Sequence, residues 1–339
     1  MPQTKIMATL ADNRASAEFV RSLREAGLDS VRINSAHVTP EGLRRVVDLV
    51  RSVDPDIAIL MDTKGPELRT TAPAAPITLA SGELLMFGFG TEPSTPDRLL
   101  CASSPEICDY VSPGDTLKID DGAIELEVLS DADAYGFISC RVSRGCSLDA
   151  RKTIALPGGQ LPPLPAVSDR DREMILAGAK AGIDMIAHSF VRSAADVEAV
   201  RSLIEGSDIE LYAKIECRKG VEKMEEIARA ADGLLVARGD LATAIDIAEI
   251  PVVQYRALML CRSMSRRSIV ATQILQSMIS APAPTRAEVS DIALAVMEGA
   301  DTLLLCGETA QGSFPRECVD TMRRTILSVE SNSLRCKIK

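Results

Sequence analysis

Charged side chains stand at the ends of neighbouring apolar runs of the sequence, and their types suit metal and phosphate chemistry. Lys214 and Glu216 end one run, and Asp240 follows the next. Two carboxylates on adjacent strands are enough to anchor a hard cation such as Mg²⁺, which keeps several waters and takes its other ligands from substrate oxygens. Because alternate residues of a strand share a face, Lys214 would lie beside that cation. This pattern predicts a site for a transferring phosphate or a developing enolate.

Polar residues take the same position after other apolar runs. They are Arg32, Asn34, Asp62, Lys64, Glu67, Ser189, Arg238, Thr272 and Glu308. Each one alone is explained as well by a solvated strand end or a salt bridge, but all of them together favour one polar pocket. Gly239 would let backbone N–H groups approach an anion there. Because the chain has no Gly-x-x-x-x-Gly-Lys-[Ser/Thr] loop, a nucleotide would have to be held in another way.

Eight short apolar runs would carry these residues, and a helical pattern follows each run. The runs are Thr4–Ala8, Ser30–Asn34, Ile57–Thr63, Met185–Phe190, Glu210–Glu216, Leu234–Ala237, Ile269–Thr272 and Thr302–Cys306. This alternation predicts an α/β fold, a (β/α)8 TIM barrel with its active site at the strand ends. A small residue and then Asp precede several strands, at 27–29, 182–184, 231–232 and 299–301, as expected where a helix turns into a parallel strand.

The stretch between the third and fourth runs has a different pattern. Turn-forming residues are frequent at Thr71–Pro76 and Glu92–Pro96, and residues 115–143 alternate like antiparallel strands. Asp120–Gly122 separates two strand-like segments as a hairpin turn would. We therefore expect residues 70–154 to form an inserted small β-barrel cap domain, with residues 1–69 and 155–339 forming the catalytic barrel. The proline-rich return at 157–165 could serve as a hinge.

The composition limits the class of protein. The 339 residues are 46% hydrophobic and carry a formal charge of −10, which favours a globular protein that does not bind nucleic acid. The absence of a long apolar stretch and of a signal-peptide pattern predicts a cytoplasmic protein with no membrane partner. Nine cysteines without a Cys-x-x-Cys pair, and only two histidines, argue against a disulfide scaffold or a zinc site.

Several longer motifs make the chain resemble the pyruvate kinase family. The strongest are MDTKGPELRT at 61–70, AKIE at 213–216, DGLLVARGDL at 232–241, ATQ at 271–273, PTRAEVSD at 284–291 and GETAQG at 307–312. VRIN at 31–34, RKTIALPG at 151–158, LPAVSDRD at 164–171 and HSFVR at 188–192 are weaker but correctly ordered. The resemblance implies a magnesium-dependent phosphotransferase of glycolysis that converts phosphoenolpyruvate and ADP to pyruvate and ATP.

The resemblance also implies a role for individual residues. Lys214 would stabilise the phosphoryl group in flight, Arg32 would contact that group, and Thr272 would lie near the enolate carbon. Glu216 and Asp240 would bind magnesium. The residues implied in binding the substrate are Ala237, Arg238, Gly239, Asp240, Thr272 and Ser189.

Nucleotide and potassium binding are implied in the same way. The residues implied at the nucleotide are Arg69, Lys152 and Asn34. Asn34, Asp62 and the Thr63 carbonyl match the family's potassium site, and Glu67 matches its potassium-dependent form. The family has a serine where this chain has Ala36, so one hydroxyl ligand of potassium is missing.

Other departures from the family pattern lie at the edge of the expected site. Cys306 replaces a serine that the family ties to protonation of the enolate, and a thiol is a weaker hydrogen-bonding group. Ala242 and Ala155 stand where the family usually has glycine and asparagine. Because the sequence ends at Lys339, we expect a short form without the family's C-terminal domain and its allosteric control.

Two further hypotheses stay open on sequence alone. The changes at Ala36, Cys306 and Ala242 would suit a magnesium-dependent lyase, decarboxylase or phosphotransferase that acts on another small 2-oxo acid. A non-catalytic protein on the same scaffold is the other alternative. The joint presence of four residues counts against it: Lys214, Glu216, Asp240 and Thr272. Either kind of protein could form a homo-oligomer through the barrel.

Overall fold

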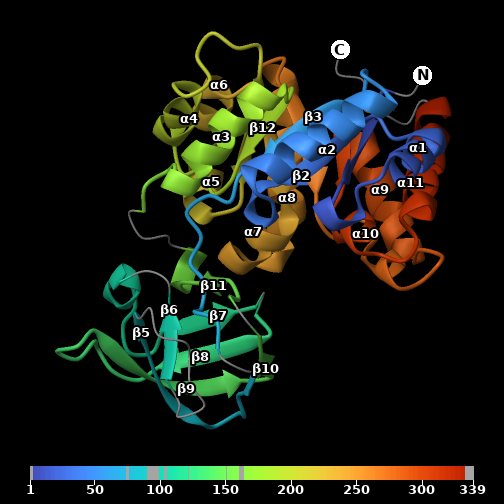
Figure 1. The fold of residues 1–339 in the computed structure, drawn as a ribbon. Coiled ribbons are helices and arrows are strands. Elements are labelled where there is room, and N and C mark those ends of the chain that lie inside the picture. The colour runs from blue at the N-terminus through green and yellow to red at the C-terminus, as the bar shows by residue number, and fades with distance from the viewer. Residues whose placement is uncertain are drawn as a thin grey trace.

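The computed structural model describes residues 3–73, 76–89, 99–102, 105–120, 122–149, 151–159 and 164–332. Eight parallel strands close into a barrel in the order β1-β16-β15-β14-β13-β12-β3-β2 (Figure 1). They are β1 (Lys5–Thr9), β2 (Ser30–Asn34), β3 (Ala58–Asp62), β12 (Met185–His188), β13 (Glu210–Ile215), β14 (Gly233–Ala237), β15 (Arg267–Ala271) and β16 (Thr302–Leu305). Each of the eight predicted runs overlaps one of these strands, so the predicted TIM barrel is confirmed.

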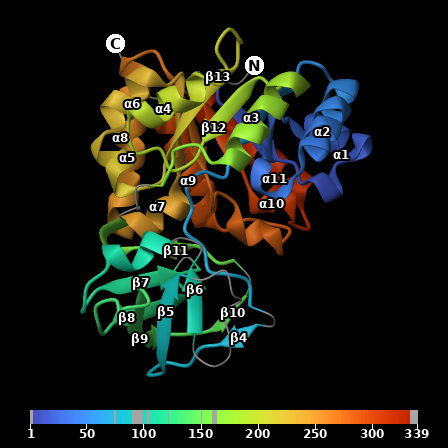
Figure 2. The same cartoon turned by 60° about the vertical axis from the view of Figure 1, so that its left-hand side comes forward.

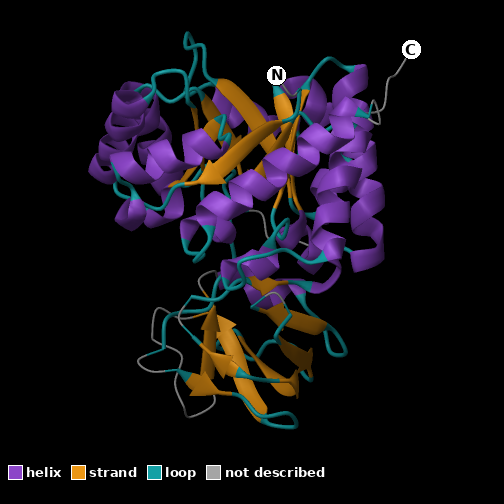
Figure 3. Ribbon diagram, turned by 90° about the vertical axis from the view of Figure 1, so that its right-hand side faces the viewer, coloured by secondary structure: helices purple, strands orange, loops and turns teal. Residues whose placement is uncertain are grey.

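Helices surround the barrel, as Figure 3 shows in purple around the orange strands. They are α1 (Ala17–Ala26), α2 (Pro40–Val53), α3 (Asp169–Ala181), α4 (Ala194–Arg201), α5 (Arg218–Glu222), α6 (Met224–Ala230), α7 (Arg238–Ala244), α8 (Ile250–Ser263), α9 (Arg286–Glu298), α10 (Gly307–Ala310) and α11 (Pro315–Ser331). Ser168 caps α3 by accepting the Asp171 N–H. Across the described ranges, no helix has both the length and the apolarity to cross a membrane.

The recurring Asp before a strand has a structural explanation. Asp29 accepts the N–H of Ile6, and Asp184 accepts that of Ile59, at 2.8 and 2.6 Å. Asp232 and Asp301 make the same kind of bond to Leu211 and Ser268, at 2.8 and 2.9 Å. Each carboxylate therefore satisfies a backbone donor near the start of a neighbouring strand, which a helix-to-strand turn would otherwise leave open.

Two apolar layers hold the barrel together. Side chains that point outward from the strands pack against the helices in one large core. A smaller cluster fills the barrel interior, and its members are Met7, Leu60, Met185, Ala187, Tyr212, Leu235, Ala237, Ile269, Ala271 and Leu304. Strands buried on both faces read as continuous apolar runs, which is why the sequence showed them clearly.

The insertion between β3 and α3 is built of strands with their own apolar core. They are β4 (Ile77–Thr78), β5 (Leu84–Phe89), β6 (Leu99–Ala102), β7 (Thr116–Ile119), β8 (Ile124–Val128), β9 (Phe137–Arg144), β10 (Ser147–Leu148) and β11 (Ile154–Ala155). The described strands form a six-stranded sheet, β11-β7-β8-β9-β5-β6, and a two-stranded one, β10-β4. The two edge strands of the larger sheet, β11 and β6, both meet the segment that enters the cap, because Arg69 pairs with Thr153 beside β11 and Thr70 pairs with Ala102 of β6. The described strands therefore curve round on themselves, as the expected small β-barrel requires.

The predicted hairpin in the cap is present. β7 and β8 pair antiparallel, and Asp120 and Gly122 both have positive φ, as the turn requires. Asp121, Glu92–Pro96 and residues 160–163 of the proline-rich return lie outside the described residues. We keep residues 70–154 as the proposed limits of the cap, although β11 continues its sheet to Ala155.

The two connections between barrel and cap run side by side as an antiparallel ribbon. Thr70 N–H donates to the Lys152 carbonyl at 2.8 Å, and Ile154 N–H donates to the Leu68 carbonyl at 2.8 Å. Figures 1 and 2 show the cap strands beyond the end of the barrel that carries α7. The short 3-10 turn Pro157–Gly159 contacts α7 there, so the cap faces the carboxyl ends of the strands.

Candidate active site

Lys214 is the centre of a buried cluster of charges at the carboxyl end of β13. Its Nζ lies 2.9 Å from Ser189 Oγ, 2.8 Å from Glu216 Oε1 and 3.1 Å from Asp62 Oδ1. The side chain is 10% exposed. Burial alone would lower the pKa of Lys214, but the carboxylates of Asp62 and Glu216 outweigh burial and raise it above its ordinary value. Lys214 is therefore a permanent positive charge at this site.

Arg32 adds a second fixed cation from β2. Its Nε lies 2.7 Å from Asp62 Oδ2, and its Nη1 donates to Thr9 Oγ1 at 3.1 Å. Burial would raise the pKa of Asp62, but Lys214 and Arg32 together hold it below its usual range. Asp62 is thus an ionised carboxylate that orients both cations, in addition to its expected role as a potassium ligand.

Glu216 and Asp240 have the features of a metal pair. Glu216 is 1% exposed, and its Oε2 accepts the Phe190 N–H at 2.8 Å. Its Oε1 has no hydrogen-bond donor in suitable geometry, although Lys214 Nζ is 2.8 Å away. Burial raises the pKa of Glu216 to about 8 despite the opposing charge of Lys214, and Asp240 and Asp62 add to the rise. A divalent cation would relieve this buried negative charge, so the residues fit a magnesium ion.

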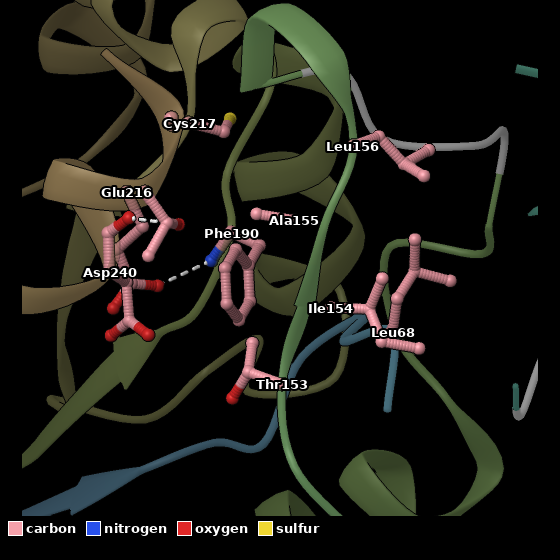
Figure 4. Close-up of a pocket in the computed structure, with 11 residues that line it drawn as sticks. Leu68, Thr153, Ile154, Ala155, Leu156, Phe190, Glu216, Cys217 and Asp240 are labelled. Carbon is pink, nitrogen blue, oxygen red and sulfur yellow. Dashed lines mark hydrogen bonds between the residues drawn. The ribbon is translucent and has the colours of Figure 1, made fainter. Parts of the chain in front are cut away.

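Asp240 lies beside Glu216 and lines the same pocket, as Figure 4 shows. It is half-buried at the start of α7, and within the described residues no donor bonds to its carboxylate. No group of three or more His, Cys, Asp or Glu side chains suited to a metal occurs among the described residues. A cation held by Glu216 and Asp240 would therefore need substrate oxygens or water to complete its shell.

The segment after β14 meets the segment after β15. Gly239 N–H donates to Thr272 Oγ1 at 2.7 Å, and Thr272 has a φ of +71°. The expected group of free N–H donors at Ala237, Arg238 and Gly239 is therefore partly engaged by the protein itself. Thr272 accepts this bond, so its own hydroxyl hydrogen stays available for another acceptor.

The Arg238 side chain holds the segment that follows β15 through hydrogen bonds. Its guanidinium donates to the Thr272 carbonyl at 2.9 Å and to Asp291 Oδ1 at 2.8 Å. Asp291 belongs to the PTRAEVSD motif, and no role was expected for it from the sequence. Arg238 therefore serves the site through its backbone position and through Thr272 rather than as a free charge.

The residues that the resemblance implies in nucleotide binding lie in two separate parts of the structure. Asn34 lines a cavity of about 560 Å³ together with Arg32, His37 and Cys306. Arg69 and Lys152 lie instead on the ribbon to the cap. Arg69 pairs with Glu67 at 2.5 Å, and Lys152 Nζ lies 3.0 Å from Asp120 Oδ2.

The residues implied at potassium are neighbours in space. Asn34 and Asp62 are register partners on β2 and β3, and Thr63 follows Asp62. Their oxygens already have partners: Asn34 Oδ1 accepts the Ala36 N–H at 3.0 Å, and the Thr63 carbonyl accepts the Ser189 hydroxyl at 2.7 Å. A cation there would have to compete with these bonds.

Three supporting contacts were not expected from the sequence. Phe190 holds Glu216, Thr9 holds Arg32, and buried Glu308 accepts the N–H groups of Leu275 and Cys306 at 3.0 and 2.8 Å. Phe190 and Glu308 lie in the motifs HSFVR and GETAQG, so the motifs were a signal for their position, although not for these bonds.

This fold and this cluster define a barrel enzyme with fixed cations beside a pair of carboxylates, a site for phosphorylated acids. Residues 1–319 match the family model "Pyruvate kinase, barrel domain". The chain is 36% identical to the pyruvate kinase of Borreliella burgdorferi over 97% of this chain and 69% of that protein. It is 39% identical to the pyruvate kinase of Geobacillus stearothermophilus and 37% identical to plastidial pyruvate kinase 2 of Arabidopsis thaliana, over 97% of this chain and 57% of each relative.

The chain therefore belongs to the pyruvate kinase family, which is a family of phosphotransferases. It spans little more than half the length of the second and third of these relatives.

Proposed function

We propose that this chain transfers a phosphoryl group between phosphoenolpyruvate and ADP, with pyruvate and ATP as products. The observation that carries the proposal is the buried Lys214 ammonium. Asp62, Ser189 and Glu216 fix it at the strand ends, where it has no freedom to turn away from a bound phosphate. Preorganised charge of this kind is the main source of catalysis in phosphoryl transfer.

Each step of the reaction has a residue that would serve it. Arg32 and Lys214 would bind the phosphoryl group and balance its charge while the bond to the enolate oxygen breaks and the bond to the ADP oxygen forms. The enolate then takes a proton at its terminal carbon to become pyruvate. The Thr272 hydroxyl, oriented by Gly239 N–H, would donate a hydrogen bond beside that carbon.

We propose Glu216 and Asp240 as the residues that hold magnesium. When bound, the ion would neutralise phosphate and carboxylate oxygens of the substrates. The protein's part is to present Glu216 Oε1 with its lone pairs open and Oε2 fixed by Phe190. We also propose a potassium site at Asn34, Asp62 and the Thr63 carbonyl, weakened by Ala36.

The nucleotide would lie in the cavity beside Arg32 that Asn34 and His37 line. Arg69 and Lys152 would reach its phosphates once they leave their acidic partners. We further propose a cytoplasmic protein that uses neither nucleic acid nor membrane as partner and that associates through its barrel.

The test is an assay of pyruvate formation from phosphoenolpyruvate, ADP and Mg²⁺, with and without K⁺. We expect turnover that requires both substrates and the metal. Absence of pyruvate formation at any metal concentration would refute the proposal. Metal-dependent breakdown of oxaloacetate without ADP would point instead to lyase chemistry on a related 2-oxo acid.

A further inference from the structure

Phe190 has a backbone conformation that its side chain disfavours. Its φ is +54°, in the left-handed region where a bulky residue other than glycine is a true outlier. A conformation of this kind is costly and persists only where surrounding contacts enforce it, commonly at functional sites. Phe190 directly follows Ser189 in the loop after β12, so both residues stand at the active-site end of the barrel.

The segment that follows β3 holds the loop around Phe190 in place. Ser189 N–H donates to Thr63 Oγ1 at 3.1 Å. A Cβ atom at Gly65 would come within 2.7 Å of Ser189 Cβ, so only glycine lets the β3 loop pack this closely. The backbone at this point therefore has little freedom to relax.

Two adjacent residues hold two adjacent members of the site. Ser189 Oγ accepts from Lys214 Nζ, and Phe190 N–H donates to Glu216 Oε2. The left-handed φ turns this N–H toward Glu216 and sends the ring in another direction. Glu216 keeps one open oxygen, so the bond from Phe190 fixes the carboxylate without using its remaining capacity.

Phe190 is 9% exposed, and its ring lies between the cap strand and the carboxylates (Figure 4). It lines one pocket with Thr153, Ile154 and Ala155 of the returning cap strand and with Glu216 and Asp240 (Figure 4). Burying an aromatic ring is worth several times RT, enough to offset the cost of the disfavoured backbone. The cap residues that line this pocket directly follow Lys152, which is proposed to bind the nucleotide.

We propose that Phe190 is a positioning residue that links the cap to Glu216. The ring, which lines the same pocket as residues 153–155, holds the left-handed backbone in place, and the Phe190 N–H then orients the carboxylate for a divalent cation. Displacing the cap strand would loosen the ring and so weaken metal binding. This inference rests on the proposed function only in taking Glu216 as a metal ligand.

The test is Mn²⁺ binding to the full-length protein without substrates, followed by electron paramagnetic resonance. Loss of an outer-shell partner typically weakens a metal site about 10- to 100-fold, so we expect about 10-fold weaker binding in Phe190→Ala and a smaller loss in Phe190→Leu. Phe19→Ala, which removes a half-buried ring from α1, after the strand that lies opposite β13 in the barrel, is the matched control and should keep wild-type affinity. Wild-type affinity in folded Phe190→Ala would overturn the inference.

A second comparison tests the link to the cap. Thr153→Ala should weaken Mn²⁺ binding by a few-fold in the wild-type background and have no further effect in Phe190→Ala. If Phe190→Ala does not fold, wild-type affinity in both Phe190→Leu and Thr153→Ala overturns the inference, as does a wild-type protein that binds no Mn²⁺. A wild type that binds Mn²⁺ through Glu216 but makes no pyruvate would refute the proposed function and leave this link supported.

Discussion

The two ends of the barrel both open into charged cavities, but only one is arranged for chemistry. At the amino end, a cavity of about 430 Å³ is lined by Glu210, Tyr212 and Arg267, among others. There Glu210 accepts the Tyr212 hydroxyl at 2.9 Å and lies 3.5 Å from Arg267. At the carboxyl end, by contrast, Glu216 Oε1 lacks a hydrogen-bond donor. Charge in a cavity is thus a weak sign of function, and charge with unfilled bonding capacity is a stronger one.

The same strand carries both arrangements. Glu210, Tyr212, Lys214 and Glu216 are alternate residues of β13 and its end, so they share one face along the barrel. The interior apolar layer, which includes the ring of Tyr212, separates the first acid from the last. Matched substitutions at the two ends of β13 and β1 can therefore test whether function belongs to one end alone.

The largest difference is expected for lysine. Lys214→Met removes the central positive charge and keeps a similar stem, so turnover should fall on the order of 10²- to 10³-fold with little loss of folded protein. Lys5→Met, the same change at the amino-end cavity, should leave turnover within about 2-fold. The measurement is kcat for pyruvate formation, with circular dichroism as a check of folding. Half of wild-type turnover in Lys214→Met would remove Lys214 from the mechanism.

The next difference concerns the carboxylates of β13 and its end. Glu216→Gln replaces an anionic oxygen by an amide, a poorer ligand for a hard cation, and should raise the half-saturating Mg²⁺ concentration at least about 10-fold. Asp240→Asn should act in the same direction. Glu210→Gln at the other end should leave that concentration unchanged, because its amide oxygen can still accept from Tyr212. Equal Mg²⁺ requirements in all three variants and the wild type would place the metal elsewhere.

A moderate effect is expected at the potassium residues. Ala36→Ser should lower the K⁺ concentration for half-maximal rate a few-fold, because it restores one oxygen that water otherwise supplies. Glu67→Lys should reduce the K⁺ dependence by providing a positive charge internally. Initial rates at constant ionic strength, with a bulky organic cation as replacement salt and Ala36→Gly as control, measure both effects. A flat K⁺ response in the wild type and in Ala36→Ser would show that no functional cation site exists.

The smallest effect is spectroscopic and concerns His188 at the end of β12. Burial lowers the pKa of His188 from 6.5 to about 4, against the opposing charge of Asp171. The unfolded chain then binds more protons than the folded one between pH 6.5 and 4, so stability is full above about pH 6.5 and declines as pH falls through that window. The His188 NMR signal, assigned with His37→Gln, should stay unchanged from pH 8 to about 5.5. A midpoint above pH 6 would contradict the burial argument.

The sequence predicted the barrel well, for a physical reason. Strands buried on both faces are continuous apolar runs, and polar residues at their ends stand out, so Lys214, Glu216 and Asp62 could be placed together from local pattern. The cap was harder, because its pairing joins strands far apart in sequence. The pair β5 and β9 shows this, since Leu84 is the register partner of Arg141.

Side-chain direction was the other limit. Nothing local predicts that Arg238 turns toward Asp291, which lies 53 residues further along the chain. A positive φ at Phe190 could not be expected either, because steric rules exclude a bulky residue from that region unless tertiary contacts enforce it. Contacts of this kind come from the folded arrangement as a whole.

The antiparallel ribbon that joins barrel and cap has a mechanical consequence. Hydrogen bonds join residues 68–70 of one strand to residues 152–154 of the other. The ribbon can therefore bend and twist as one unit, but these bonds resist sliding of one strand along the other. Arg69 and Lys152 stand on opposite strands of this ribbon, so any bending of the ribbon would move both residues in the same direction. A single rotation would therefore bring both charges to the proposed nucleotide site or withdraw them together, so the number of cations around a bound polyphosphate would change by two at once.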